Sequence, residues 1–223
     1  MRSAVLLSCI SIAVAAQNPY VVAPSHYHLI FENAWARATR VTYGPHEHAP
    51  VHDHPPTPTV YIYVTDGGIM RFHHITGEHV AGFTIDRPAV KAGAIRFAHG
   101  APETHSVEYL GDRPTEYIRI ELRTEPLERP TRDVRLPPVS LDAAKSAVET
   151  QFENAQVRIL RVMCAAGQAC PASPQPDDPA IEVTMAGPLR GHVQWKPQWS
   201  PPPGEGPLEL VRIELKTKPV AVP

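Results

Sequence analysis

The sequence has little that would suit it to bind nucleic acid or to span a membrane. Its 21 lysine and arginine residues are balanced by 23 aspartate and glutamate residues, for a formal charge of −2. No basic patch with interleaved aromatic residues is present. Apart from one apolar run at the N-terminus, no stretch is long and apolar enough to cross a bilayer as a helix. We therefore expect neither a nucleic-acid partner nor a stable membrane anchor.

Several common catalytic motifs are also missing, and cysteine is scarce. The sequence has no phosphate loop, no Gly-x-Ser-x-Gly and no His-Glu-x-x-His. Of its three cysteines, Cys164 and Cys170 lie close together in a loop of small residues, and neither has the surroundings of a papain-type nucleophile. In an oxidising compartment such a pair can form a disulfide, and two free thiols are the alternative.

The N-terminus has the parts of a secretory signal peptide. Arg2 supplies a basic start, residues 4–14 form an apolar run, and small residues follow before Gln17. We predict that residues 1–16 are a signal peptide and that the mature protein is secreted or periplasmic. Two alternatives stay open, a lipoprotein with its lipid on Cys9 and an ordinary buried N-terminal segment.

Proline is abundant, at 26 of 223 residues, and it breaks helices and central strands. Short runs rich in β-branched and aromatic residues lie between the prolines and glycines, as is typical of β-strands. The expected strands are Phe31–Asn33, Trp35–Tyr43, Thr59–Val64, Ile69–Ile75, His79–Ile85, Ala94–Ala98, Thr104–Tyr109 and Glu116–Leu122, with a hairpin turn at Thr76-Gly77-Glu78. Their regular spacing predicts an all-β barrel or sandwich.

Part of the sequence occurs twice. Phe31-Glu32-Asn33-Ala34 returns as Phe152-Glu153-Asn154-Ala155, 121 residues later, and Arg119-Ile120-Glu121-Leu122 returns as Arg212-Ile213-Glu214-Leu215, 93 residues later. The second copy is therefore shorter by about 28 residues, lost between Leu189 and Leu210. Self-similarity of this kind predicts two tandem copies of one structural unit.

The repeat sets the expected domain boundaries. The N-terminal domain covers residues 17–126 and a shortened C-terminal domain covers residues 151–223. Residues 127–150 form a charged, proline-rich linker. Within the linker, Ser140–Glu149 has the pattern of a short helix with Ser140 as its N-cap.

Histidine is concentrated in the first copy, where 11 of the 12 lie between His26 and His105. Because residues two apart in a strand point to the same face, His52 and His54 can direct both rings to one point, with Asp53 turned away. Imidazole is the commonest metal ligand among side chains. The pattern favours a metal site over a solvated histidine-rich loop. At the repeat offset these two positions become Ser173 and Gln175, so the second copy lacks the ligands.

The first copy resembles the cupin superfamily. The residues that carry the resemblance are His52-Asp53-His54-Pro55, the apolar strand that ends at Asp66-Gly67, Lys91–Phe97 and Thr104–Glu108. The resemblance covers about Phe31 to Glu125, and Phe152–Lys218 resembles a shortened cupin. It implies a double-stranded β-helix of the jelly-roll type in two tandem copies, a bicupin with a degenerate second half.

The resemblance also implies that His52, His54 and His105 hold one divalent transition metal and leave coordination positions open. Many cupins have a carboxylate five residues after the second histidine, where this sequence has Thr59. The metal is therefore left open among Fe, Mn, Ni, Cu and Zn. The candidates for further ligands or supporting groups are His46, His48, His99 and Glu103. The candidates for pocket residues are Thr59, Tyr61 and Tyr63. His73, His74 and His79 are expected on the surface of a hairpin.

These observations predict an exported metal-binding cupin that binds a small molecule, and they leave its activity open. One interpretation is a metal-dependent oxygenase acting on a small organic or aromatic substrate. A second is a non-catalytic module that binds a small ligand or a metal. A third is a metal buffer that uses the additional loop histidines. The C-terminal copy is interpreted as structural, either covering an edge of the first barrel or forming the surface of a homodimer.

Overall fold

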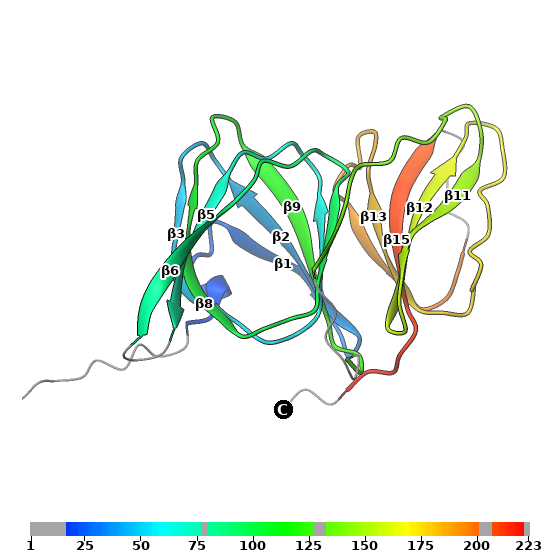
Figure 1. The fold of residues 1–223 in the computed structure, drawn as a ribbon. Helices are drawn as coiled ribbons and strands as arrows, with labels where there is room; N and C mark the ends of the chain where they lie inside the picture. Colours follow the sequence, from blue (N-terminus) through cyan, green and yellow to red (C-terminus); the bar gives the residue numbers. More distant parts are fainter. Residues whose placement is uncertain (1–16, 77–79, 127–132, 201–206, 221–223) are drawn as a thin grey trace, which may run out of the picture.

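The computed structural model describes residues 17–76, 80–126, 133–200 and 207–220 (Figure 1). The predicted signal peptide and the centre of the predicted hairpin turn, with His79, lie outside the described residues. The elements within them are α1 (Pro19–Val22), β1 (Tyr27–Glu32), β2 (Ala36–Tyr43), β3 (His48–His54), β4 (Thr59–Tyr63), β5 (Met70–Thr76), β6 (Val80–Arg87), β7 (Ile95–Ala98), β8 (Glu103–Tyr109), β9 (Thr115–Leu122), β10 (Val134–Leu136), β11 (Ala147–Glu153), β12 (Val157–Cys164), β13 (Ala180–Thr184), β14 (Val193–Lys196) and β15 (Leu208–Leu215). In this part of the chain no helix has the length and apolar character to cross a membrane.

The strands form three antiparallel sheets. One has the order β1-β2-β9-β4-β7-β10, a second β3-β8-β5-β6, and the third β11-β12-β15-β13-β14. The first two sheets face each other and form a barrel, which we call the N-terminal barrel, and the third sheet packs against its outside (Figure 1). We call the third sheet and its loops the C-terminal unit. The all-β fold expected from the sequence is therefore found, with most strand ends close to those predicted, although β1 begins at Tyr27, four residues before the expected Phe31.

Strand β9 shows how the alternation of side chains builds two different environments. Ile118, Ile120 and Leu122 point outward and belong to a core shared with the C-terminal unit. Tyr117 packs on the opposite face, in a core inside the barrel. Side chains two apart in a strand share a face, so Arg119 and Glu121, both buried, point inward with it. On β9 the inward face is therefore polar and aromatic, whereas the outward face is aliphatic.

Equivalent hydrogen bonds recur in the two halves of the chain. The Asn33 side-chain oxygen accepts from the backbone N–H of Trp35 and Ala36, and the Asn154 oxygen accepts from Gln156 and Val157. Strands β11, β12, β13, β14 and β15 occupy the order of β1, β2, β4, β7 and β9. Within the described residues the C-terminal unit has no counterpart of the β3-β8-β5-β6 sheet, so it is a single sheet and not a barrel.

The two units contact each other reciprocally. Arg40 of the N-terminal barrel donates from Nη2 to the carbonyl oxygen of Gly191 at 2.9 Å. Arg161 of the C-terminal unit donates from Nη2 to the carbonyl oxygen of Gly93 at 2.6 Å. Both glycines have positive φ, 79° and 85°, which side chains with a Cβ rarely adopt. An arginine and a glycine carbonyl oxygen therefore join the two units in both directions.

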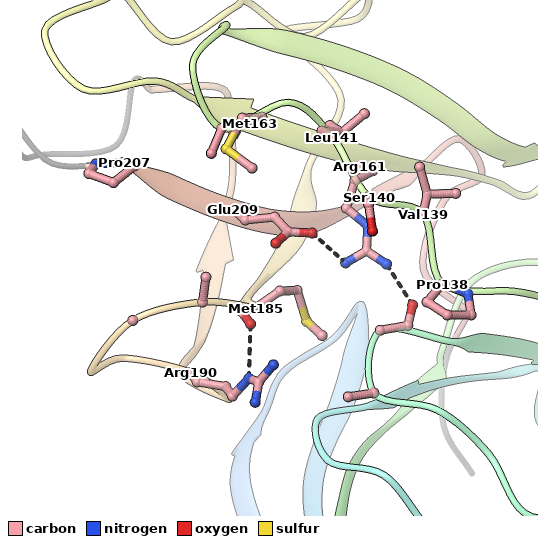
Figure 2. A pocket seen from close by; sticks show the side chains of 15 residues that line it. Pro138, Val139, Ser140, Leu141, Arg161, Met163, Met185, Arg190, Pro207 and Glu209 are labelled. Atoms are coloured by element: carbon pink, nitrogen blue, oxygen red, sulfur yellow. Dashed lines mark hydrogen bonds and ion pairs between the residues drawn. The ribbon is translucent and has the colours of Figure 1, made fainter.

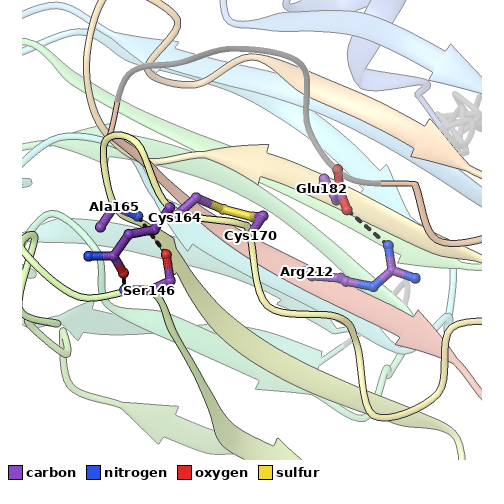
Figure 3. Close-up of a disulfide and its surroundings, with 7 residues drawn as sticks. Ser146, Cys164, Ala165, Cys170, Glu182 and Arg212 are labelled. Atoms are coloured by element: carbon purple, nitrogen blue, oxygen red, sulfur yellow. Dashed lines mark hydrogen bonds and ion pairs between the residues drawn. A yellow bond between two sulfur atoms is a disulfide. The ribbon is translucent and has the colours of Figure 1, made fainter.

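A disulfide joins Cys164 at the end of β12 to Cys170, with the Cα atoms 4.6 Å apart (Figure 3). Cys164 belongs to a small core with Leu160, Val162 and Leu210 on the face of the C-terminal sheet that points away from the barrel. The bond closes a six-residue separation and ties the following loop to this face. Of the two alternatives, the structure has the bonded pair.

The predicted helix at Ser140–Glu149 is wrong. The side chain of Asp142 accepts from the backbone N–H of Ala144 at 3.0 Å, which makes a turn, and from Ala147 the chain is extended as β11. Pairing with β12 over the length of the strand outweighs a weak helical preference. The segment expected to be only a linker also contains β10, which pairs with β7 and extends the sheet of the N-terminal barrel.

Candidate metal centre

Strands β3 and β8 bring three histidines together. The β3–β8 register shifts between Ala49 and His52, which marks a bulge in an edge strand. Beyond the bulge, His52 is the cross-strand partner of His105. Because His54 follows two residues later, its ring lies on the same face of β3. The local sequence contributes to this geometry, since Pro50 lacks an N–H and is tolerated only at such an edge or bulge.

The three rings form a compact group inside the barrel. One ring nitrogen from each of His52, His54 and His105 lies within 4.8 Å of the others. The side chains are nearly inaccessible, with residue exposures of 0%, 9% and 1%. Within the described residues this is the one group of three or more His, Cys, Asp or Glu side chains so placed. Asp53 is not part of it, because its carboxylate accepts from the hydroxyl of Thr104.

The hydrogen bonds of His52 define which of its nitrogens is free to bind a metal. Nδ1 lies 2.7 Å from the carbonyl oxygen of Pro50, and because a carbonyl only accepts, Nδ1 carries the proton. Nε2 is therefore unprotonated, and its lone pair accepts a hydrogen bond from the Tyr27 hydroxyl at 2.9 Å, which a metal ion on Nε2 would replace. A ring fixed in this tautomer by a backbone carbonyl is typical of metal-binding histidines. Tyr27 was not among the residues predicted from the sequence.

His105 supplies the strongest test of whether these residues suit a metal. Both of its ring nitrogens are buried without a hydrogen-bond partner among the described residues. Unsatisfied buried polar atoms are costly and rare in folded proteins. Burial lowers the pKa of His105 from 6.5 to about 2, and burial also lowers the pKa of His54 well below its usual range. Both rings are therefore neutral at pH 7, which is the form that binds a metal, and the donor set fits a divalent transition ion.

His74 is closer to this group than the sequence suggested. It was expected on the surface of a hairpin, but it is the cross-strand partner of His105, and the two ring centres lie 5.1 Å apart. It stacks between Phe72 and Phe83, with ring centres 6.0 Å and 4.6 Å away, and is half-buried. The alternation of β5 decides this placement, since His74 shares the inward face with Phe72 and His73 points outward.

A cavity of about 400 Å³ adjoins the histidine group. Its wall includes His54 and the predicted pocket residues Thr59 and Tyr61, together with His99 and Glu103. Tyr63 does not line this cavity. It faces a separate, much smaller one, which it shares with Tyr61.

Two arginines complete the cavity wall and were missed in the sequence. Arg119 and Arg96 are the cross-strand neighbours of Tyr61 on either side, and both are almost fully buried. Arg119 pairs with Glu121, and Arg96 donates from Nε to Asp133 at 2.9 Å. Arg119 Nε and Arg96 Nη1 have no hydrogen-bond partner among the described residues. The repeated Arg-x-Glu sequence was the available signal, but it does not say which face of β9 the pair occupies.

The additional candidate ligands separate into two groups. Glu103 lies 3.7 Å from Nδ1 of His105, and His99, 3.4 Å from the Asp133 carboxylate, lines the cavity. His46 instead contacts the exposed Asp112 at 3.0 Å. His48, also exposed, begins β3 at the opposite end from His54. Only Glu103 and His99 are therefore placed at the cavity.

In the C-terminal unit, Ser173 and Gln175 stand at the positions that correspond to His52 and His54. Ser173 is buried, and its hydroxyl donates to the carboxylate of Glu214. Glu214 also accepts from Arg212 at 3.1 Å and from Arg158 at 3.0 Å. Gln175 is exposed. The site equivalent to the histidine pair thus serves a buried ion-pair network and offers no metal ligands.

Comparisons with known proteins identify the fold. No family model and no curated protein matches the sequence. Among solved structures, YhaK from Escherichia coli matches with a TM-score of 0.57 and 12% identity over 93% of this chain and all of that one. A point mutant of oxalate decarboxylase from Bacillus subtilis matches with 0.51 and 11%, over 88% of this chain and 77% of the other. Quercetin 2,3-dioxygenase from Acinetobacter baumannii matches with 0.50 and 13%, over 83% and 75%.

These neighbours are members of the cupin superfamily, so the chain has the cupin β-barrel fold. At 11–13% identity the likeness extends to the fold and no further.

Proposed function

We propose that this protein is a metal-dependent cupin whose N-terminal barrel binds one divalent transition metal through His52, His54 and His105. The observation that carries the proposal is His105, buried in the barrel with both ring nitrogens unpaired beside two other neutral imidazoles. A bound divalent ion would satisfy one of those nitrogens. Three histidines leave coordination positions open for water, oxygen or substrate.

We further propose that the metal centre supports oxygenase chemistry on a small organic substrate. A metal in such a site supplies Lewis acidity or an oxygen-binding centre. The Pro50 carbonyl keeps the His52 proton on Nδ1 and leaves Nε2 for a metal, which would take the place of the hydrogen bond from the Tyr27 hydroxyl. Phe72, whose ring centre is 5.0 Å from that of His105, forms an apolar wall. Support comes from the fold shared with a quercetin 2,3-dioxygenase and an oxalate decarboxylase.

The cavity beside His54 is the proposed substrate site. Arg96 and Arg119 would orient a substrate through hydrogen-bond donors that the protein leaves unpaired, and Tyr61 lies between them on the same wall. Glu103, at the cavity wall and 3.7 Å from His105, is placed to accept a proton. We expect it to assist the centre in place of the carboxylate that Thr59 cannot provide.

The finer organisation of the chain belongs to the same proposal. We propose that the chain is a bicupin in which the C-terminal unit is a degenerate second copy. The recurrence of strand order and of the Asn33 and Asn154 hydrogen bonds supports this duplication. We also propose that residues 1–16 are a signal peptide and that the protein is exported. The disulfide between Cys164 and Cys170 suits an oxidising compartment.

A non-catalytic metal- or ligand-binding module is the second candidate, and one observation favours it. Thr59 replaces the usual anionic ligand, and its neutral hydroxyl, which donates to the carbonyl oxygen of Thr57 at 2.9 Å, brings no negative charge to the site. The metal-buffer interpretation has less support, because His46 and His48 are placed away from the histidine group.

The deciding experiment is elemental analysis of residues 17–223, purified without a histidine tag or added metal, followed by oxygen uptake with phenolic and dicarbonyl compounds. We expect one equivalent of Fe, Mn, Ni, Cu or Zn in the wild type and less than a tenth in the His52→Ala/His54→Ala double variant. His46→Ala/His48→Ala is the matched control and should retain the metal. Full metal content in the first variant would refute the site, and metal without oxygen uptake would favour the binding module.

A further inference from the structure

A second cavity, of about 430 Å³, lies at the junction of the two units and is separate from the histidine site (Figure 2). Its wall combines Gly93 of the barrel, Leu141 of the linker and four side chains of the C-terminal unit, Arg161, Met185, Arg190 and Glu209. Cavities of this size accommodate small organic ligands.

Arg161 is the unusual group in this cavity. It is only 1% exposed, yet its guanidinium makes two hydrogen bonds, from Nη1 to Glu209 at 3.3 Å and from Nη2 to the carbonyl oxygen of Gly93 at 2.6 Å. Nε has no partner among the described residues. Burial lowers the pKa of Arg161, although Glu209 acts in the opposite direction. The buried guanidinium of Arg161 therefore has fewer hydrogen-bond partners than a buried charged group normally has.

The equivalent arginine of the other unit shows that this burial is not a requirement of the interface. Arg40 makes the same pair of contacts, to Glu116 at 2.6 Å and to the carbonyl oxygen of Gly191 at 2.9 Å, but its side chain is 35% exposed. Arg161 is less exposed than Arg40 because residues 138–143 of the linker pass over it. The linker therefore adds a wall beside one of two similar contacts and makes an open cavity there.

The remaining wall indicates the chemistry of a ligand. Arg190 donates from Nε to the carbonyl oxygen of Met185 at 3.0 Å, and no partner of its outer nitrogens is present among the described residues. Glu209 on the cavity wall and Glu149, the cross-strand partner of Arg161, are the two carboxylates that act on Arg161, so Arg190 is the guanidinium left without a carboxylate partner among the described residues. Figure 2 shows the side chain of Met185 between the guanidinium groups of Arg161 and Arg190. Met163 and Leu141 add flexible apolar surface.

We propose that this junction cavity is a binding site for a small monocarboxylate with an apolar body, no larger than one aromatic ring. The carboxylate would pair with the outer nitrogens of Arg190, near the buried guanidinium of Arg161, and the body would contact Met163 and Met185. The site depends on the linker and the C-terminal unit and is independent of any metal in the barrel.

Benzoate is a suitable probe, with benzyl alcohol as its uncharged counterpart. We would titrate both into protein labelled with ¹³C at the methionine methyl groups. Met163 and Met185 report on the cavity, and Met70, in β5, is the internal control. We expect benzoate to saturate and to shift only the two cavity methyls, and benzyl alcohol to bind at least tenfold more weakly.

Variants at the exposed rim avoid disturbing the core. Arg190→Gln should weaken benzoate binding at least fivefold, and Ala143→Phe, which fills the mouth from the linker, should abolish it. Arg40→Gln, the matched control in the other unit, and His52→Ala/His54→Ala should bind as the wild type does. The proposal is overturned if benzoate shifts neither cavity methyl, if benzyl alcohol binds equally well, or if Ala143→Phe leaves binding unchanged.

Discussion

His52 and His105 are direct cross-strand partners in β3 and β8, and their ring centres lie 4.9 Å apart inside the barrel. The two residues are 53 positions apart in the chain, so only the pairing of these strands brings them together. His52 has hydrogen bonds at both ring nitrogens and His105 has none among the described residues. Because of this difference, replacing His105 is the best way to test whether the three histidines form a metal site or only a polar pocket.

Replacement of His105 by leucine should abolish metal binding without destabilising the metal-free protein. Leucine is similar in size and removes two buried polar atoms that lack partners, each of which costs about 1–3 kcal/mol. In thermal unfolding, the metal should raise the melting temperature of the wild type and leave that of His105→Leu unchanged. A metal-free variant less stable than the metal-free wild type by more than about 2 kcal/mol would show that His105 is structural.

Replacement of Glu103 by glutamine should weaken metal binding about tenfold and leave the fold unchanged. Glu103 lies 3.7 Å from His105, and losing such a supporting group typically reduces affinity about 10- to 100-fold. Glu108→Gln is the matched control, since it lies on the same strand but is exposed and contacts His73. Competition with a chromogenic chelator gives both affinities. Equal metal affinity in the two variants would show that Glu103 does not support the metal site.

The C-terminal unit should be required for a soluble protein. It covers an aliphatic wall of the barrel that includes Ile62, Ile118 and Ile120, all fully buried. We expect a chain lacking residues 141–223 to aggregate, because it would expose this patch. In the full chain, Ile213→Ala should cost about 2–5 kcal/mol in chemical denaturation, and the exposed Ile69→Ala almost nothing. A soluble truncated barrel with metal bound would contradict the structural role of this unit.

Loss of the disulfide should lower stability without affecting the metal. Cys164 and Cys170 are six positions apart, and closing so short a loop contributes about 2 kcal/mol through the entropy of the unfolded chain. The Cys164→Ser/Cys170→Ser variant should show this difference in urea unfolding against the oxidised wild type. With dithiothreitol present the two should become similar. A difference that persists under reducing conditions would mean that packing of Cys164, and not the bond, is responsible.

Stability should fall in acid partly through Glu153. Hydrogen bonds from Arg158 and Lys216 lower the pKa of its carboxyl from 4.5 to about 2 in the folded protein. Because the folded pKa is below the unfolded one, the contribution is complete above pH 4.5 and is lost as the pH falls toward 2. The difference in melting temperature between wild type and Glu153→Gln should therefore be largest above about pH 5 and vanish near pH 2.

Glu149→Gln is the control for the acid experiment. It lies on the same strand, is exposed and has no ion pair among the described residues. Its difference from the wild type gives the baseline for replacing a carboxylate by an amide on this strand. A constant difference for Glu153→Gln would show that its ion pairs do not contribute in solution.

The sequence alone predicted the features that depend on neighbours along the chain. The strand pattern, the repeat at Asn33 and Asn154, and the shared face of His52 and His54 follow from local periodicity, which the chain carries in every short segment. The closeness of Cys164 and Cys170 is also visible in the sequence, although their bonding was left open. The one local prediction that was wrong, the helix at Ser140–Glu149, concerned a segment whose conformation depends on pairing with β12.

Only the tertiary structure decided what lies across a sheet or inside the barrel. His74 joins His105 because β5 pairs with β8, and Arg119 faces the cavity because the outer face of β9 is needed for the shared core. Arg161 is buried because the linker passes over it. Such contacts join residues that are distant in sequence, and their geometry is set by register and packing, which no local pattern encodes. Local periodicity determined the strands and the shared face of His52 and His54, the family resemblance added His105, and the fold decided the placement of His74, Arg119 and Arg161.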